Sequence, residues 1–196
     1  MKTVLNDYAL NQLFYDARSF NGWHDQNIDK KTLVQLWNLT RMGPTSANSS
    51  PMRVVFVITR KNKEKLRPCL IESNVEKAMT ASAVAIIGHD MAFAEMLPKL
   101  FPHTDAQSWF EGNDELTATT AFRNGTLQGA YLMLAARALG IDCGPMSGFN
   151  NDLVDATFFK GTDVKSNFLC CLGHGDSSSL FKRSPRLEFD DACKIV

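Results

Sequence analysis

The sequence predicts an α+β fold, because three or four β-prone apolar segments are interspersed with about six stretches of helical periodicity. The chain has 196 residues, of which 44% are hydrophobic, so it is long enough for one domain with a substantial core. It contains no internal repeat, low-complexity segment or linker, and we therefore assign residues 1–196 to a single domain. The residue pattern alone leaves an α/β arrangement open.

Two helices and a strand are expected in the first third of the chain. The first helix covers residues 5–18, and the second begins after Asp29, a good N-cap residue, and ends near Gly43. A β-prone segment at 53–59 follows after a loop. The apolar side chains at helical spacing are Leu5, Tyr8, Ala9, Leu13 and Phe14 in the first helix, and Leu33, Leu36, Trp37 and Leu39, expected to face inward, in the second.

The middle of the chain combines a charged helical stretch, a buried strand and an irregular aromatic region. Residues 61–70 are charged and helical in pattern, and the apolar run 81–88 is expected to form a buried strand. Residues 91–110 are expected to form either a lid over a site or a satellite hydrophobic cluster under a long loop. Their aromatic and neighbouring residues include Phe93, Phe101, Pro102, His103, Trp109 and Phe110.

The longest helical pattern covers residues 113–139, and we expect it to be the central helix, closed by Gly140. Gly125 and Gly129 inside it each cost about 1 kcal/mol relative to alanine. We expect them to allow another backbone to approach closely, from a packed or symmetry-related helix. The expected apolar face of this helix consists of Leu116, Phe122, Leu127, Ala130, Tyr131, Leu134, Ala138 and Leu139. An extended piece, a helix and a strand are then expected at 141–143, 152–159 and 168–172.

The composition argues against several classes of function. The 21 basic and 21 acidic residues give a formal net charge of zero, so we expect no nucleic-acid partner and no membrane association. The first residues lack the apolar run of a signal peptide, and no apolar stretch reaches the length of a membrane span, so we expect a cytoplasmic protein. Five cysteines without CxxC spacing and four scattered histidines predict reduced thiols and no metal site.

The sequence contains no GxGxxG, P-loop, HExxH or GxSxG motif, which argues against a Rossmann dinucleotide loop or a hydrolase nucleophile. What remains is a set of groups that can bind anions or amides although they lie far apart in the sequence. They are Arg18, the small polar loop 43–51, Asn74 with Lys77, the segment 144–149, and Arg183 with Arg186. A guanidinium group matches phosphate with a planar fork, so arginines from both ends of the chain suit one phosphate.

Through these residues the chain resembles the nitroreductase family of FMN enzymes, and within it the malonic semialdehyde reductases of pyrimidine breakdown. The resemblance covers nearly the whole chain. It rests on Arg18 with Asn21-Gly22-Trp23, 43–51, Asn74-x-x-Lys77, 100–103, 121–124, 144–149, and 175–178 with Arg183-x-Pro185-Arg186. It implies an obligate homodimer with a mixed, mainly antiparallel sheet flanked by helices. The long helix would lie in the interface, and two tightly bound FMN molecules would lie between the subunits.

The resemblance also implies which residues contact the phosphate. Arg18 and Arg186 would hold it, with Arg183 as a second candidate for the arginine near the C-terminus. Phe20 stands where family members often carry serine, so a side-chain contact is lost there, and Asn21 is expected to compensate. The loop residues implied to line the flavin site of the other subunit are Thr45, Ser46 and Asn48.

A second group of residues is implied to surround the flavin ring. Asn74 and Lys77 would contact its pyrimidine end, where a positive charge favours electron transfer to the ring. Backbone N–H groups of a turn would face flavin N5. That turn consists of Pro145, Met146, Ser147 and Gly148.

The activity implied by the resemblance is ping-pong hydride transfer from NADH or NADPH through flavin N5 to a small acceptor. The specific expectation is malonic semialdehyde, reduced to 3-hydroxypropionate, because Ser50, Met52 and Ser147 depart from residues common in nitroaromatic reductases. Arg123 and His103 are candidate substrate contacts, with a salt bridge and a surface position as the respective alternatives. A nitroaromatic or quinone reductase, a flavin-binding carrier or sensor without turnover, and an interaction domain without flavin remain alternatives.

Overall fold

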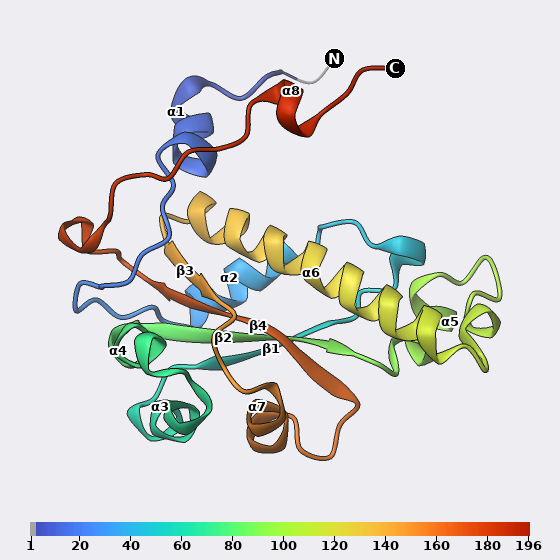
Figure 1. Cartoon of the computed structure of the whole chain (residues 1–196). Helices are drawn as coiled ribbons and strands as arrows, with labels where there is room; N and C mark the ends of the chain where they lie inside the picture. The colour runs from blue at the N-terminus through green and yellow to red at the C-terminus, as the bar shows by residue number, and fades with distance from the viewer. Residues whose placement is uncertain (1–2) are drawn as a thin grey trace.

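A four-stranded antiparallel sheet forms the centre of the molecule (Figure 1). The computed structural model describes residues 3–196. The strands, in their order across the sheet, are β1 (Met52–Val57), β2 (Ala83–Asp90), β4 (Val164–Gly173) and β3 (Asp142–Met146). All three ladders are antiparallel, and a single parallel bridge joins Ser19 to Cys143. The expected α+β class with a mainly antiparallel sheet is therefore confirmed.

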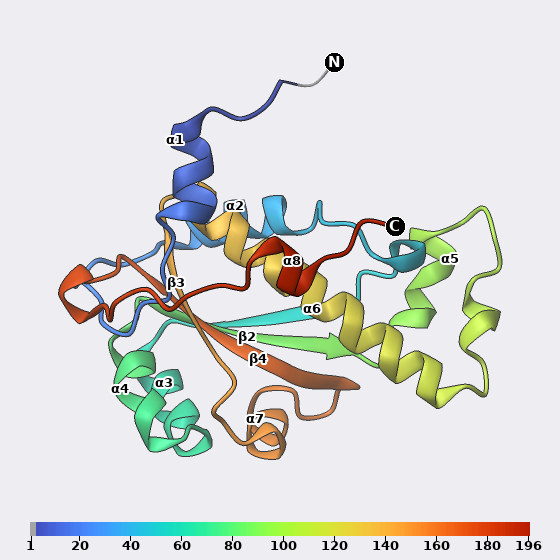
Figure 2. The same ribbon diagram turned by 45° about the horizontal axis from the view of Figure 1, so that its top comes forward.

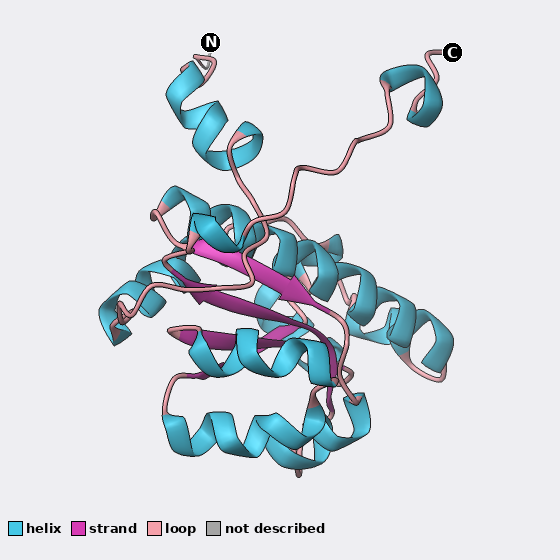
Figure 3. Ribbon diagram, turned by 60° about the vertical axis from the view of Figure 1, so that its left-hand side comes forward, coloured by secondary structure: helices cyan, strands magenta, loops and turns pink. Residues whose placement is uncertain are grey.

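Helices cover both faces of this sheet. Helices α2 and α6 lie on one face, and α3, α4 and α7 lie on the other (Figures 1 and 3). The helices of the described chain are α1 (Asp7–Leu10), α2 (Lys30–Thr40), α3 (Arg60–Leu66), α4 (Glu72–Thr80), α5 (Leu97–Leu100), α6 (Asp114–Ala138), α7 (Asn151–Phe158) and α8 (Phe189–Ala192). The predicted N-cap is also confirmed, because the carboxylate of Asp29 accepts a hydrogen bond from the backbone N–H of Thr32.

The two faces of the sheet carry two separate hydrophobic cores. Because successive side chains of a strand point to opposite faces, Ala85 and Ile87 of β2 pack with α2 and α6. Val84 and Ile86 of the same strand pack with α3, α4 and α7. Strand β2 is therefore buried on both sides, which explains why its residues 83–88 form an unbroken apolar run.

The glycines of α6 accommodate side chains of the sheet beneath the helix. A Cβ atom at Gly129 would lie 2.6 Å from the ring of Phe168, and one at Gly125 would lie 2.9 Å from Cβ of His89. Within the chain, the elements that approach these glycines are strands of the sheet and not a packed helix. The missing side chains let α6 lie close to β2 and β4, which offsets the helix propensity lost at both positions.

The outward face of α6 is more apolar than the sequence analysis expected. Six of the eight residues of its expected apolar face are exposed, namely Leu116, Phe122, Leu127, Ala130, Tyr131 and Ala138. The buried face consists instead of mainly small and polar residues: Thr120, Ala121, Asn124, Gly125, Gln128, Gly129, Leu132, Ala135 and Ala136. Apolar residues occur all around this helix, so its periodicity could not identify the side that packs on the sheet.

Both terminal segments extend away from the body formed by the sheet and its helices (Figures 1 and 2). The helix expected over residues 5–18 is shorter, since α1 is followed by a π-helical turn at Asn11–Tyr15. The apolar residues of these segments are largely exposed, including Leu5, Tyr8, Phe14, Phe181, Leu187 and Phe189. Each terminal segment thus presents apolar side chains that the rest of the chain does not cover.

The aromatic region after β2 packs against one end of α6. Phe93, Leu97, Ala106 and Ala121 form a third buried cluster, and Phe101 packs at its edge. This arrangement confirms the satellite hydrophobic cluster that was one of the two expectations for residues 91–110.

His89 is a buried histidine of β2 whose pKa is lowered. Its side chain is 7% exposed, and its Nδ1 has no hydrogen-bond partner among the described residues. Burial lowers the pKa of His89 below the ordinary value of 6.5, and the carboxylate of Asp155 partly opposes this effect. The unfolded chain therefore binds the proton more readily than the folded chain. The stability contributed by neutral His89 is complete above pH 6.5 and is lost as the pH falls below it.

We expect the free energy of unfolding to fall between pH 7.5 and pH 5.5, because His89 binds a proton more readily in the unfolded chain than in the folded chain. The variant His89→Phe, which keeps a ring beside Phe122, should show a smaller change over the same interval. Urea unfolding of both proteins at the two pH values measures the difference. An identical pH dependence in the two proteins would contradict this assignment.

Candidate functional site

Five cationic side chains surround one pocket of about 280 Å³ between the two ends of the chain. They are Arg18, Arg137, Lys182, Arg183 and Arg186. None of the described residues that line the pocket is acidic, and the ion pairs found within residues 3–196 involve other side chains. The structure thus brings together the arginines expected from opposite ends of the chain, and their uncompensated positive charge suits an anion such as phosphate. We call this site the Arg18 pocket.

Hydrogen bonds from arginine to backbone carbonyl groups hold the two chain segments together. Arg18 Nη2 donates to the carbonyl oxygen of Phe181 at 2.5 Å. In the opposite direction, Arg183 Nη2 donates to the carbonyl oxygens of Tyr15 at 2.7 Å and Ala17 at 3.0 Å. A guanidinium group has five N–H donors, so each of these arginines keeps donors for a ligand.

Two of the five cations were not identified from the sequence. Lys182 directly precedes Arg183 in the sequence, and this position could have identified Lys182 as a further cation of the site. Arg137 lies in the last turn of α6, half-buried, where its Nη1 donates to the carbonyl oxygen of Leu13 at 3.0 Å. The sequence pattern of α6 does not indicate that the Arg137 side chain lines a pocket with residues 17–19.

Residues 18–23 connect this pocket to a second group of predicted site residues. The backbone N–H of Phe20 donates to the carbonyl oxygen of Cys143 in β3. Further along, Trp23 Nε1 donates to the carbonyl oxygen of Lys77 at 3.0 Å. Asn21 lies exposed in the same segment. One short segment beside the sheet therefore carries Arg18 at one end and is bound to the backbone of Lys77 at the other.

The structure also brings Asn74 to the turn after β3. Asn74 Nδ2 donates to the carbonyl oxygen of Gly148 at 3.0 Å, and the backbone N–H of Ile71 donates to the same oxygen at 3.2 Å. A Cβ atom at Gly148 would collide with Ile71 and would lie 2.7 Å from Asn74 Nδ2, so a larger residue here would displace these two side chains. The expected turn residues begin in β3, with Pro145 half-buried, Met146 buried and Ser147 exposed.

Lys77 is a largely buried residue of α4, three residues after Asn74. The residue is 8% exposed, and none of the ion pairs within the described chain involves it. Burial raises the pKa of the nearby Cys171 thiol to about 12, although the positive charges of Lys77 and Lys63 oppose the shift. Cys171 therefore stays a neutral thiol at pH 7 and does not neutralise Lys77. Lys77 Nζ is not among the buried side-chain nitrogens of the described chain that lack a partner, so its ammonium is accessible to a ligand that carries or develops negative charge.

The loop 43–51 has a strained backbone that several side chains hold in place. Ala47, Asn48 and Ser50 have positive φ angles of 49°, 50° and 43°. Asn124 Oδ1 accepts a hydrogen bond from Ser46 N at 2.8 Å, and Thr45 Oγ1 accepts one from Ser50 N at 3.1 Å. These bonds fix the loop against α6. Ser46 and Asn48 nevertheless remain exposed.

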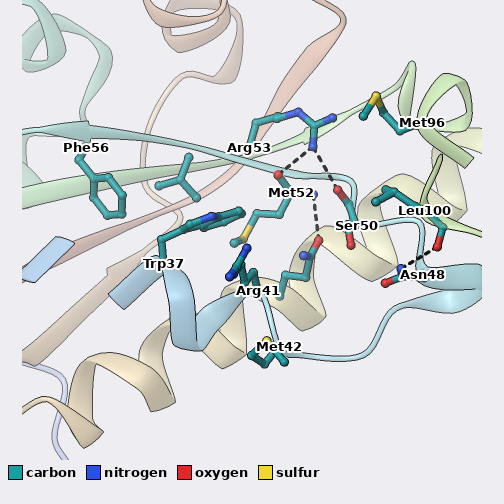
Figure 4. Close-up of a pocket in the computed structure, with 12 residues that line it drawn as sticks. Trp37, Arg41, Met42, Asn48, Ser50, Met52, Arg53, Phe56, Met96 and Leu100 are labelled. Atoms are coloured by element: carbon teal, nitrogen blue, oxygen red, sulfur yellow. Dashed lines mark hydrogen bonds between the residues drawn. The ribbon is translucent and has the colours of Figure 1, made fainter. Parts of the chain in front are cut away.

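This loop lies away from the Arg18 pocket of its own chain. It lines a different cavity of about 710 Å³, where Asn48 and Ser50 face α2, β1 and the α5 region (Figure 4). Asn124, which binds the loop, lies 13 residues before Arg137 on α6, a distance of about 20 Å at 1.5 Å per residue. Within a single chain, the loop 43–51 therefore does not reach the Arg18 pocket.

The two candidate substrate contacts lie on exposed parts of the chain. Arg123 belongs to the outward face of α6, where it lines a shallow apolar groove of about 700 Å³ with Phe122 and Leu127. His103 is exposed, and its ring lies 3.9 Å from the ring of Phe101. Neither residue lines the Arg18 pocket.

The described part of the chain contains no group of three or more His, Cys, Asp or Glu side chains that could hold a metal ion. Within residues 3–196, the helices are too short or too polar to cross a membrane.

The family model described as the Nitroreductase family matches residues 17–175. A protein of Burkholderia lata, whose name is that of an NADH dehydrogenase/NAD(P)H nitroreductase, is 58% identical, covering 98% of this chain and 99% of the relative. A protein of Cupriavidus pinatubonensis with the same type of name is 56% identical, covering 95% of this chain and 97% of that relative. Both alignments span nearly the full length of the proteins compared.

Solved structures share the fold at lower identity. The crystal structure of a nitroreductase from Exiguobacterium sibiricum in complex with FMN has a TM-score of 0.87, with 20% identity and complete coverage of both chains. A nitroreductase structure from Bacillus subtilis has a TM-score of 0.86 with 20% identity, covering 97% of this chain and 100% of that one. The arrangement of the sheet and the long helix is therefore shared with these proteins.

Proposed function

The chain belongs to the nitroreductase family, and we propose that it is an FMN-dependent oxidoreductase that takes electrons from NADH or NADPH. The observation that carries this proposal is the pocket of five cations, connected by residues 18–23 to the backbone of Lys77. The names of the relatives, which specify NAD(P)H, and the FMN of the Exiguobacterium structure support it. When bound, FMN supplies a carrier that takes hydride from the nicotinamide and passes it to an acceptor.

The residues of the Arg18 pocket fit the phosphate of FMN. Arg18 and Arg186 would hold the phosphate dianion with charge-assisted hydrogen bonds, and Arg183 would assist while it ties down residues 15–17. Asn21, exposed in the segment that leaves the pocket, would contact the cofactor next to Arg18. The pocket has the charge for this role, since none of its described lining residues is acidic.

The residues beside β3 would hold the ring of the flavin. Asn74, positioned by its bond to Gly148, and the ammonium of Lys77 would face the ring's pyrimidine end, where the positive charge stabilises added electrons. The turn whose backbone N–H groups would lie near the reactive edge of the ring consists of Pro145, Met146, Ser147 and Gly148. Charge and positioning, rather than a protein nucleophile, would then account for catalysis.

The buried thiols support a mechanism without covalent catalysis by cysteine. A hydrogen bond with Cys143, together with burial, raises the pKa of Cys170 well above its ordinary value, and burial raises that of Cys171 to about 12. Both side chains are fully buried. A thiol must ionise to act as a nucleophile, so neither cysteine is suited to that role at neutral pH.

The protein would work as a homodimer whose two flavin sites each use both chains. Thr45, Ser46 and Asn48 lie away from the Arg18 pocket of their own chain, so they would reach the site of the partner subunit. The exposed apolar residues on the outward face of α6 and on the terminal segments provide the surface that a second copy would cover.

We expect Leu127→Asp, on the outward face of α6, to raise the dimer dissociation constant at least about tenfold, because a charge would be buried in an apolar interface. Sedimentation velocity over a concentration series measures this effect. Ile58→Asp, at an exposed apolar position after β1, is the matched control and should leave the dimer intact. A wild-type protein that is monomeric at micromolar concentration would contradict the assignment of loop 43–51 to the partner's site.

For the acceptor, we propose malonic semialdehyde, reduced to 3-hydroxypropionate. Arg123 would bind the carboxylate of the substrate and His103 would supply a proton, because both are exposed and able to face a partner subunit. A second candidate is a nitroaromatic or quinone reductase, and the names of the relatives, which specify nitroreductase activity, favour nitroaromatics. A flavin-binding carrier or sensor without turnover is the candidate from another class.

We expect Arg18→Ala and Arg186→Ala each to weaken FMN binding by about 1.5–3 kcal/mol, the contribution of a hydrogen bond to a charged group. Fluorescence titration with FMN measures the affinity, and Arg60→Ala, an exposed arginine of α3 outside the pocket, is the control. Unchanged affinity in both variants would overturn the phosphate assignment. Wild-type protein that binds no FMN and stays colourless after its addition would overturn the proposed function.

Turnover with alternative acceptors should identify the substrate class. With NADH or NADPH as donor, we expect kcat/KM for malonic semialdehyde to exceed the values for a nitroaromatic and a quinone by at least about tenfold. The opposite order would establish the second candidate. Failure of NADH and of NADPH to bleach the bound flavin anaerobically would instead support a carrier or sensor.

A further inference from the structure

Arg137 lines the Arg18 pocket, although it belongs to the long helix α6. None of the sequence motifs that indicated the site includes this residue. We propose that Arg137 is an additional phosphate-binding residue of the cofactor site, which ties the end of α6 to the bound cofactor. This inference rests on the proposed function, because the ligand it requires is the phosphate monoester of FMN.

The position of the Arg137 side chain is fixed by two neighbouring bonds. Arg137 Nη1 donates to the carbonyl oxygen of Leu13 at 3.0 Å, and Gln12 Nε2 donates to the carbonyl oxygen of Arg137 at 2.7 Å. The first bond uses one of five guanidinium N–H donors. The remaining donors belong to a half-buried group that lines the pocket with Ala17, Arg18 and Ser19.

The charge around Arg137 is the second argument. A cation in the last turn of a helix is favourable by itself, because it faces the negative end of the helix dipole. That effect does not require the guanidinium to line a pocket with four further cations, which repel it. A bound dianion removes this repulsion, and a phosphate monoester carries that charge near pH 7.

The alternative is that Arg137 only fastens residues 12–13 to α6. Gln12 makes the reciprocal bond, so the chain offers a matched control. Gln12→Leu removes one bond of this attachment and leaves every cation of the pocket in place. Arg137→Gln removes a cation while it keeps an amide donor near Leu13.

The experiment measures the FMN dissociation constant of each protein at several salt concentrations. We expect Arg137→Gln to weaken FMN binding about tenfold and to make binding less dependent on salt, because one charged contact is lost. Gln12→Leu and the surface control Arg60→Gln should stay within about twofold of the wild type at each salt concentration.

Two outcomes would overturn the inference. One is FMN affinity of Arg137→Gln within twofold of the wild type, and the other is weaker binding with the salt dependence of the wild type. Should Arg137→Gln fail to fold, Arg137→Lys decides: it keeps the charge and should bind with the wild-type salt dependence but about threefold more weakly, because the planar fork is lost. A reduced salt dependence in Arg137→Lys would contradict the proposal. Wild-type protein that binds no FMN at all would overturn the proposed function itself.

Discussion

Hydrogen bonds from guanidinium groups to backbone carbonyls hold the two ends of this chain together, and the candidate site depends on them. Arg18 donates to the segment near residue 181, and Arg183 donates back to residues 15–17. These bonds keep several positive charges within one small pocket, where the charges repel one another. The arrangement is therefore most stable with an anion present, so ligand binding and the order of both terminal segments are coupled.

Helix α6 has two faces with different tasks. Glycines and small residues on its inward face let the sheet approach, so Phe168 and His89 fit beneath the helix. Its outward face carries large apolar side chains such as Phe122 and Leu127. A helix that packs its small residues inside and leaves its large ones outside is typical of an element that completes its burial against a second copy.

Local patterns predicted the strands, α2 and α6 because the strands are β-prone apolar runs, α2 begins at the N-cap Asp29, and α6 is a long stretch of helical pattern closed by glycine. The grouping of Arg18 with Arg183 and Arg186 followed from arginine chemistry together with the family resemblance. The orientation of α6 was not predictable, because apolar residues surround it and the inward face is chosen by tertiary packing. Arg137 was not found for the same reason, since only the packed helix brings its side chain to the pocket.

The Arg18 pocket can form only late during synthesis on the ribosome. Arg18 and the carbonyl group of Phe181 to which it donates are 163 residues apart. At a translation rate of about 5–20 residues per second, the two halves of the pocket emerge roughly 8–30 s apart. A nascent chain thus exposes Arg18 long before it can hold a phosphate, and a prematurely terminated chain never acquires the pocket. Cofactor capture would then require that synthesis has passed Arg186.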